Sequence, residues 1–202
     1  MNALTTLSPD EVTFVAETLL PTETGHFRVR AYRDGRSQTE PVAIISGDVE
    51  GGRGVAVRVH DECLTSEVLG SLKCDCKNQL DAALAYIREH GGVVIYLRQE
   101  GRGIGLANKI AAYRLQEEGL DTVDANRALG LPDDAREYHA AKAILDDLQL
   151  DGIRLLTNNP RKLEKLTALG VEIVAREPIV VEGNPHSQGY LDAKASRMRH
   201  LL

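Results

Sequence analysis

The sequence contains no tryptophan, and aromatic residues make up only 4% of its 202 positions. A core built from this composition is aliphatic, and a hydrophobic content of 43% supports a packed fold rather than a disordered chain. No segment approaches the roughly 20 apolar residues that span a bilayer. Residues 1–10 also lack the basic region and apolar run of a signal peptide. We therefore expect a cytoplasmic protein with no membrane partner.

An excess of positive charge is also missing. The formal net charge is −6 and the sequence pI is about 5.5, which argues against general nucleic-acid binding. Small anionic ligands are still compatible, because basic residues cluster at two predicted strand-to-helix junctions. These residues are Arg98, Arg102 and Lys109 at the first junction and Arg161, Lys162 and Lys165 at the second.

Cysteine is scarce, but its three copies, Cys63, Cys74 and Cys76, lie in one short stretch. An odd number cannot pair fully as disulfides, and Cys74 and Cys76 are too close to bridge each other without strain. Free thiols fit a reducing cytoplasm. Three soft ligands in one neighbourhood predict a zinc site.

The spacing leaves the type of zinc site open. Structural sites are normally closed by four protein ligands, whereas catalytic sites keep one position for water. Three cysteines favour the catalytic type, but His60 is a candidate fourth ligand that would close the site. Asp61, Glu62 and Asp75 are further candidates. Small buried cysteines without a metal are the remaining alternative.

Hydrophobic patterning predicts an α/β fold with a mixed sheet. Short β-rich segments fill the first third of the chain, and strands alternate with helices after it, which implies some parallel pairing. The predicted strands are 27–32, 42–45, 55–59, 93–97, 153–157 and 171–174. The predicted helices lie around 80–90 and over 106–118, 137–148 and 160–169, and an amphipathic segment over 191–202 is either a docking helix or a loose tail.

The loop Glu100–Gly105 joins a predicted strand to a predicted helix. Its glycines allow backbone N–H groups to approach an anion at the start of the helix. The spacing is not a dinucleotide fingerprint, because Leu106 stands where the third glycine would fall, and no Walker sequence follows. A tight turn between packed elements explains the loop equally well.

The segment Thr157–Lys162 forms a second junction of this kind. Asn159 is suited to cap the following helix, and Pro160 is suited to its first turn. Arg161 and Lys162 would then oppose the helix dipole, which a bound anion would compensate. The alternative is a capped helix whose basic side chains point into water.

Further residues have default structural interpretations. Asp133 and Asp134 precede a predicted helix, and one of them is expected to be its N-cap. Tyr113 lies at helical spacing from Leu106 and Ile110, so it is expected to pack in the core.

Taken together, these motifs resemble the GTP cyclohydrolase II family of riboflavin biosynthesis, over almost the whole chain. The resemblance rests on Arg58–Thr65, Ser71–Cys76, Arg98–Arg102, Asn108–Lys109, Ala125–Asn126, Leu156–Lys162 and Asn184–Pro185. It implies an extension over 1–19, a catalytic domain over 20–182 and a tail over 183–202. It also implies a homodimer that converts GTP to 2,5-diamino-6-ribosylamino-4(3H)-pyrimidinone 5′-phosphate, formate and pyrophosphate.

The resemblance further implies roles for individual residues. Cys63, Cys74 and Cys76 would hold one zinc ion per subunit with water in the fourth position, Tyr113 would assist ring opening, and Asp134 would accept a proton. The positions that match GTP contacts are Arg58, Val59, His60, Asp61, Glu62, Gln79, Glu100, Gly101, Arg102, Thr122, Thr157 and Lys162. Glu100 is our candidate for reading the guanine edge, because a carboxylate accepts two parallel hydrogen bonds. Cleavage of a triphosphate also predicts Mg²⁺.

Arg136 matches a position assigned in the family as nucleophile towards the α-phosphorus. A protonated guanidinium has no free lone pair, so an electrostatic clamp on the phosphate is the alternative role. Lys73 and Lys77 depart from the family pattern beside the Cys-x-Cys pair, and they are either phosphate-facing or solvated. The competing functions are a paralogue that acts on a related purine nucleotide or stops at the formylated pyrimidine, and a nucleotide sensor with structural zinc.

Overall fold

Aliphatic strands from the middle of the chain form the centre of a seven-stranded mixed sheet in the computed structural model, which describes residues 11–179 and 181. The strands are β1 (Val12–Thr22), β2 (Gly25–Asp34), β3 (Val42–Ser46), β4 (Arg53–Asp61), β5 (Gly92–Leu97), β6 (Asp151–Leu156) and β7 (Ile173–Glu177). The helices are α1 (Leu64–Glu67), α2 (Cys76–His90), η1 (Glu100–Gly103, a 3₁₀ turn), α3 (Leu106–Glu117), α4 (Thr122–Ala128), α5 (His139–Asp147) and α6 (Pro160–Ala168).

The strand order across the sheet is β1-β2-β3-β5-β4-β6-β7. The β-rich first third supplies antiparallel pairs from β1 to β3, and β3 pairs antiparallel with β5. From β5 onward, β4, β6 and β7 pair in parallel. The predicted fold class, an α/β protein with a mixed sheet, is confirmed.

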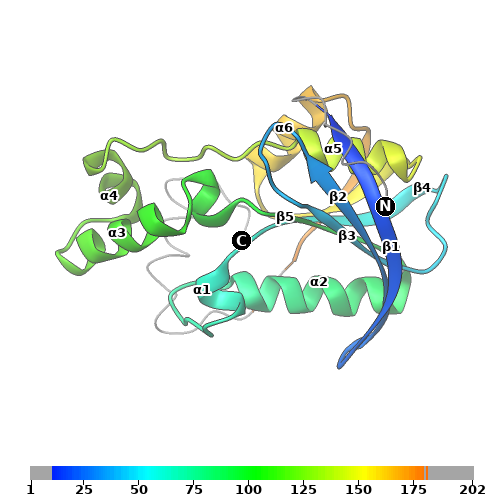
Figure 1. Ribbon diagram of the computed structural model, residues 1–202, viewed down its shortest axis with the longest axis horizontal. Coiled ribbons are helices and arrows are strands. Elements are labelled where there is room, and N and C mark those ends of the chain that lie inside the picture. The colour runs from blue at the N-terminus through cyan, green and yellow to red at the C-terminus, as the bar shows by residue number, and fades with distance from the viewer. Residues whose placement is uncertain (1–10, 180, 182–202) are drawn as a thin grey trace, which may run out of the picture.

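Helices cover both faces of the sheet (Figure 1). Helix α2 lies on one face, where Ala83 and Ile87 are fully buried against Val94 and Leu156. Helices α5 and α6 lie on the other face and contribute their apolar side chains to the larger cluster of buried residues. This arrangement explains the near-continuous apolar run of β5, which is buried on both sides.

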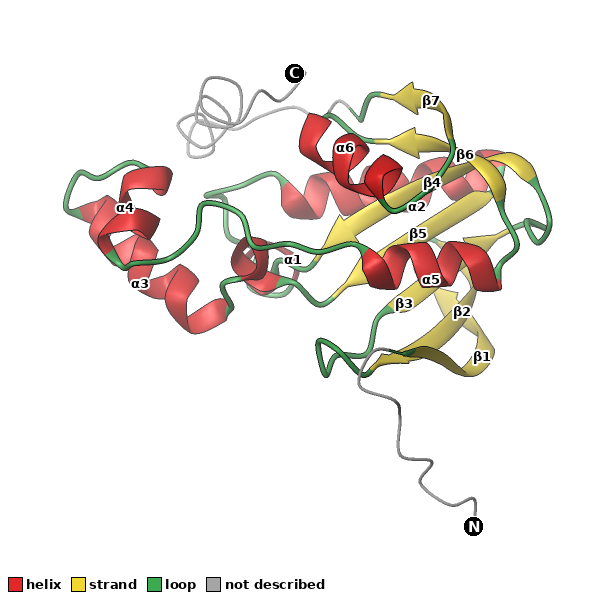
Figure 2. Ribbon diagram, turned by 90° about the horizontal axis from the view of Figure 1, so that it is seen from above, coloured by secondary structure: helices red, strands yellow, loops and turns green. Residues whose placement is uncertain are grey.

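Helices α3 and α4 project away from the sheet beyond the ends of its central strands (Figure 2). Asp121 begins α4 as an N-cap, because its side chain accepts hydrogen bonds from the backbone N–H groups of Val123 and Asp124. No helix among residues 11–179 is long and apolar enough to cross a membrane.

The connections that leave β4 and β5 diverge to opposite faces of the sheet at the carboxyl ends of these strands. The two strands run in parallel, with Asp61 paired with Leu97 at their last residues. The chain leaves β4 towards α2 on one face, and it leaves β5 through α3 and α4 towards α5 on the opposite face. Ligand sites in α/β sheets occur where such connections diverge.

Most predicted elements are present, with small shifts at their ends. The sequence prediction missed β1, α1 and α4. Strand β1 crosses residues 19 and 20, where the sequence placed the start of the catalytic domain, and it pairs with β2 along its length. The expected tail over 183–202, including the amphipathic segment over 191–202, lies outside the described residues.

Candidate active site

A cavity of about 460 Å³ lies at the carboxyl ends of β4 and β5 and is bounded on its far side by α3 and α4. Eleven of the predicted site residues line it, namely Asp61, Glu62, Cys63, Cys74, Cys76, Glu100, Gly101, Arg102, Tyr113, Thr122 and Arg136. The segment that follows β4, the glycine-rich segment that follows β5 and the projecting arm therefore meet at one place.

The three cysteines form one cluster in the wall of this cavity. Cys63 follows β4, Cys76 begins α2, and Cys74 precedes it. Their Sγ atoms all lie within 4.8 Å of one another, and those of Cys63 and Cys74 are 3.7 Å apart. Tetrahedral zinc with Zn–S bonds of about 2.3 Å places sulfur atoms about 3.8 Å apart. The donor set therefore fits a zinc ion in chemistry and in spacing.

The electrostatics of the cluster also favour a cation. Hydrogen bonds from the thiols of Cys74 and Cys76, with the nearby ammonium of Lys109, lower the pKa of Cys63. The interactions of Cys74 and Cys76 with Cys63 raise the pKa of each of these two thiols. A divalent cation between the three sulfur atoms would favour the ionised form of each thiol.

None of the four candidate fourth ligands belongs to the cysteine cluster. Among the described residues, the only cluster of metal-ligating side chains is that of the three cysteines. His60 is buried, its Nε2 lies 2.8 Å from Glu67 Oε1, and burial lowers its pKa. Glu67 also accepts a hydrogen bond from the backbone N–H of Cys63. His60 therefore supports the loop that carries Cys63 from behind.

Lys109 connects the cysteine cluster to the glycine-rich segment. Its Nζ donates to Cys63 Sγ at 3.1 Å, to Thr65 Oγ1 at 2.9 Å and to Glu100 Oε1 at 2.8 Å. Burial alone would lower the pKa of Lys109, but Glu100 and Cys63 raise it, so the group is an ammonium. Glu100 also accepts hydrogen bonds from the backbone N–H groups of Leu64 and Gly101.

Tyr113 lies one helical turn beyond Lys109 on α3 and faces the cavity. Its ring lies under two ammonium groups, with Lys73 Nζ at 4.9 Å and Lys109 Nζ at 5.7 Å from the centroid. Burial raises the pKa of its hydroxyl. The side chain is half-buried in the cavity wall, so the default expectation of a core residue is wrong.

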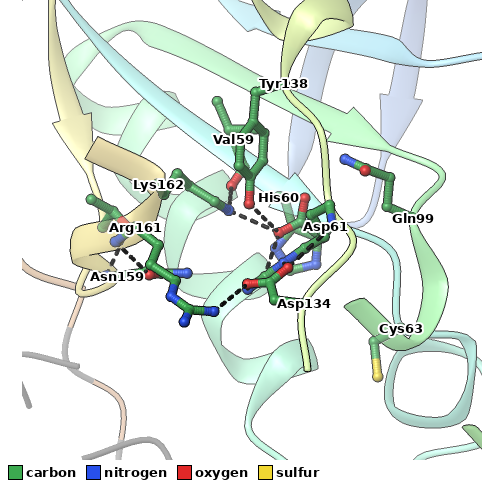
Figure 3. Close-up of polar contacts among 12 residues, drawn as sticks. Val59, His60, Asp61, Cys63, Gln99, Asp134, Tyr138, Asn159, Arg161 and Lys162 are labelled. Atoms are coloured by element: carbon green, nitrogen blue, oxygen red, sulfur yellow. Dashed lines mark hydrogen bonds and ion pairs between the residues drawn. The ribbon is translucent and has the colours of Figure 1, made fainter. Parts of the chain in front are cut away.

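A second polar cluster centres on Asp61 (Figure 3). Asp61 Oδ2 accepts from Arg136 Nη1 at 2.9 Å, from Lys162 Nζ at 3.0 Å and from the Tyr138 hydroxyl at 3.4 Å. Asp134 holds the opposite side of the Arg136 guanidinium, at 2.9 Å from Nε and 2.7 Å from Nη2. In the same view Cys63 lies to one side of this network.

The cluster holds two cations, Arg136 and Lys162, close to two carboxylates, Asp61 and Asp134. Burial alone would raise the pKa of Asp61, but Lys162 and Arg136 lower it to about 2. Burial lowers the pKa of Lys162 to about 8, although Asp61 opposes this. The Oδ1 atom of Asp61 is buried and has no protein partner. A cluster of two cations and a partly satisfied carboxylate is suited to exchange partners when an anion enters.

Several predicted contact residues lie behind the cavity rather than in its wall. Arg58 donates to the carbonyl of Leu156 at 3.0 Å and to Gln79 Oε1 at 2.6 Å. Thr157 accepts from the backbone N–H of Asn159 at 3.1 Å. Of the predicted contacts, Arg58, Val59, His60, Gln79, Thr157 and Lys162 are absent from the cavity lining.

Two expectations about helix starts have opposite outcomes. Asn159 caps α6 by accepting from the backbone N–H of Arg161, with Pro160 in the first turn, as predicted. The prediction that Asp133 or Asp134 is an N-cap is wrong, because α5 begins at His139 after Tyr138. The Asp134 carboxylate is instead committed to Arg136.

The lysines that depart from the family pattern have separate environments. Lys73 reaches Glu117 at 3.3 Å and lies over Tyr113, so it borders the cavity. Lys77 pairs with Asp81 at 2.6 Å on the exposed face of α2, which matches the solvated alternative.

Sequence reasoning missed some residues of the site. Asn126 is buried and lines the cavity, and only its place in a family motif pointed to it. Lys109 was predicted only as part of a basic cluster, and its contacts with Cys63, Thr65 and Glu100 were not foreseen. Nothing in the local sequence signals Tyr138 as a partner of Asp61, because the two residues are far apart in the chain.

Comparison with known proteins assigns the chain to a family. The sequence model of GTP cyclohydrolase II matches residues 13–178. The chain belongs to the GTP cyclohydrolase II family. It is 50% identical to the GTP cyclohydrolase-2 of Hahella chejuensis over 192 residues, which cover 95% of this chain and 93% of the relative.

Longer members of this family contain the same unit within a larger protein. The chain is 50% identical to the riboflavin biosynthesis protein RibBA of Bacillus mycoides, covering 95% of this chain but 48% of that protein. The RibBA of Synechocystis is 51% identical over 90% of this chain and 33% of that protein. The chain thus spans half or less of these two relatives. A solved structure of RibBX from A. baumannii is 19% identical with a TM-score of 0.47, covering 85% of this chain and 40% of that chain.

Proposed function

We propose that this protein hydrolyses GTP to 2,5-diamino-6-ribosylamino-4(3H)-pyrimidinone 5′-phosphate, formate and pyrophosphate, the first step of riboflavin biosynthesis. The observation that carries the proposal is the meeting of a three-cysteine cluster, Tyr113 and Arg136 in the wall of one cavity. The end of the cavity with the cysteines is suited to hydrolysis of the guanine ring, and the Asp61–Arg136 cluster is suited to binding a phosphate.

The cysteine cluster is the proposed centre of ring opening. Cys63, Cys74 and Cys76 would hold the zinc ion through their sulfur atoms. When bound there, zinc supplies a Lewis acid that makes water nucleophilic at neutral pH. C8 of guanine is a weak electrophile, so hydrolysis at that carbon requires such activation. Two successive hydrolyses at C8 would open the imidazole ring and then release formate.

Tyr113 is the proposed proton donor and acceptor for this end of the cavity. Its hydroxyl is uncharged at working pH, because burial raises its pKa. A neutral phenol can donate a proton to a ring nitrogen as the C–N bond breaks. The ammonium groups of Lys73 and Lys109 over its ring would stabilise negative charge on the oxygen afterwards.

Arg136 and Asp134 are the proposed catalytic residues at the phosphate end. The guanidinium of Arg136 would stabilise charge on the α-phosphate as water attacks the α-phosphorus and pyrophosphate leaves, and Asp134 would accept a proton from that water. Lys162 reaches the same carboxylate of Asp61 and would offer a second cation. We also propose that Mg²⁺ binds with the triphosphate, because it neutralises phosphate charge that these side chains do not reach.

Glu100 has limited capacity to read the guanine edge. Its carboxylate already accepts from Leu64, Gly101 and Lys109. An ionised carboxylate offers about four lone-pair positions. One further hydrogen bond from the base is compatible with this, so a neighbouring polar group must complete the recognition. The buried side chain of Asn126 in the cavity wall is suited to do so.

The direct test follows all products from GTP. Purified protein loaded with zinc is mixed with GTP and Mg²⁺, and pyrimidine absorbance, formate and pyrophosphate are measured together. Equal amounts of formate and pyrophosphate are expected. Pyrophosphate without formate would point to an enzyme that stops at the formylated pyrimidine, and binding without products would point to a sensor.

We predict that Tyr113→Phe slows formate release by about 10²–10⁴-fold, the usual contribution of a general acid or base, while zinc stays bound. The change removes one hydroxyl and keeps the ring under both ammonium groups. Stopped assays for formate, with zinc content measured on the same sample, check this. Full activity of the variant would leave Tyr113 as a packing residue only.

The assembly and location of the enzyme are also proposals. We propose a homodimer, supported by the exposed apolar side chains of Phe14, Leu19 and Leu20 on the edge strand β1. Light scattering tests this, and a monomer at micromolar concentration would contradict it. Three free thiols further support a reducing compartment such as the cytoplasm.

A further inference from the structure

All three hydrogen-bond donors of the Lys109 ammonium are paired with protein acceptors. Its ammonium has three N–H donors, and each has an acceptor within 3.1 Å on Cys63, Thr65 and Glu100. The side chain is only 11% exposed. A saturated ammonium of this kind has no donor left for a substrate, so its function must lie in the residues that it holds.

The position of Lys109 on α3 requires such partners. The residue lies in the first turns of the helix that begins at Leu106, where a cation opposes the helix dipole. Burial adds a desolvation cost. The Cys63 sulfur and the Glu100 carboxylate offset both costs, because each accepts a hydrogen bond from the ammonium.

The three acceptors come from different segments of the site. Cys63 and Thr65 follow β4, whereas Glu100 follows β5 and is itself bonded to the backbone of Leu64. Lys109 therefore ties the ends of two parallel strands to the projecting helix. The same helix carries Tyr113 one turn further on.

We propose that Lys109 is a positioning residue of the metal centre, which fixes the Cys63 sulfur as a ligand and sets α3, and with it Tyr113, relative to that ligand. The inference rests on the proposed function only for the identity of the metal. Three thiolates around a divalent cation carry one net negative charge, and the ammonium that donates to Cys63 Sγ and Glu100 Oε1 stabilises that charge. A hydrogen bond to a metal-ligating atom also holds its orientation.

The test compares zinc binding by Lys109→Met with that by Lys77→Met, without nucleotide. Methionine keeps an unbranched side chain and removes the ammonium. Lys77 is the matched control, because it adjoins the ligand Cys76 but points to Asp81 at the surface. Competition with a chromophoric chelator measures the affinity for zinc, and circular dichroism checks the fold.

We expect Lys109→Met to bind zinc about 10–100-fold more weakly, as is typical when a partner of a metal ligand is lost. Lys77→Met should bind zinc as the unchanged protein does. Wild-type affinity in Lys109→Met would overturn the proposal. Equal weakening in both variants would also overturn it, because general loss of charge would then explain the effect.

A second variant covers the case in which Lys109→Met does not fold. Lys109→Arg keeps the charge, but a planar guanidinium cannot direct three donors as the ammonium does. With Co²⁺ in place of zinc, the thiolate-to-metal absorption bands of this variant should shift. Bands and affinity identical to those of the unchanged protein would contradict the proposed positioning role.

The outcome is separable from that of the proposed function. If the unchanged protein binds zinc and Lys109→Met weakens it, but GTP is not consumed, the inference on Lys109 stands and the proposed reaction fails. If the unchanged protein binds no zinc, both are wrong.

Discussion

Replacing Cys74 by serine is expected to abolish zinc binding and formate release from GTP together. Serine keeps the size of the side chain, but its hydroxyl stays protonated at neutral pH and is a poor zinc ligand. The cluster would keep only two sulfur donors, Cys63 and Cys76. Formate release should fall at least about a thousandfold, equivalent to about 4 kcal/mol of the activation barrier.

The measurement combines elemental analysis of the purified variant with the formate assay. Leu72→Ser is a suitable control, because it adds a hydroxyl to the same loop at a side chain that is 57% exposed. The control should retain zinc and turnover. Formate release at the normal rate by Cys74→Ser, or zinc retained at normal stoichiometry without activity, would break the proposed link between this cluster and ring opening.

The parts of the fold that the sequence predicted are those with strong local patterns. Strands β4, β5 and β6 read as short apolar runs bounded by glycine or polar residues, and α2 and α6 have clear helical periodicity. Strand β1 was missed because apolar residues occur on both of its faces, which are largely exposed, so the alternation that marks a half-buried strand is absent. Leu19 and Leu20 are both exposed in the structure. Helix α4 is short, so it offers too few turns for a periodic signal.

The residues of the candidate site also fall into those that local sequence predicts and those that it does not. The cysteine cluster was predictable, because its ligands are close in sequence and only a few chemistries suit three thiols. The pairing of Asp61 with Arg136 joins residues 75 positions apart and depends on where β4 ends. The three partners of Lys109 likewise come together only through the parallel pairing of β4 with β5. Contacts of this kind depend on topology, which single-sequence patterns do not determine.

Arg136→Lys is expected to reduce pyrophosphate release from GTP by about 10²–10³-fold, the usual effect of removing one preorganised donor to developing charge. The guanidinium bridges Asp134 and Asp61 through three of its nitrogens, and lysine offers a point charge that cannot reproduce this fork. Lysine still neutralises the two carboxylates, which keeps the fold. A neutral residue would leave buried Asp134 without its main cation and Asp61 with Lys162 alone, and breaking a buried ion pair costs about 3–5 kcal/mol.

The same variant bears on how Arg136 acts. Although burial opposes it, Asp61 and Asp134 raise the pKa of Arg136. A charged guanidinium has no lone pair for attack on phosphorus, which supports our proposal that Arg136 acts as an electrostatic clamp. Arg161→Lys is the control, because Arg161 is half-exposed and its Nη1 lies 4.0 Å from Asp134 Oδ2. Pyrophosphate release at the normal rate in Arg136→Lys would show that neither a fork nor a nucleophile is needed at this position, and the phosphate end of the site would then have to be sought around Lys162.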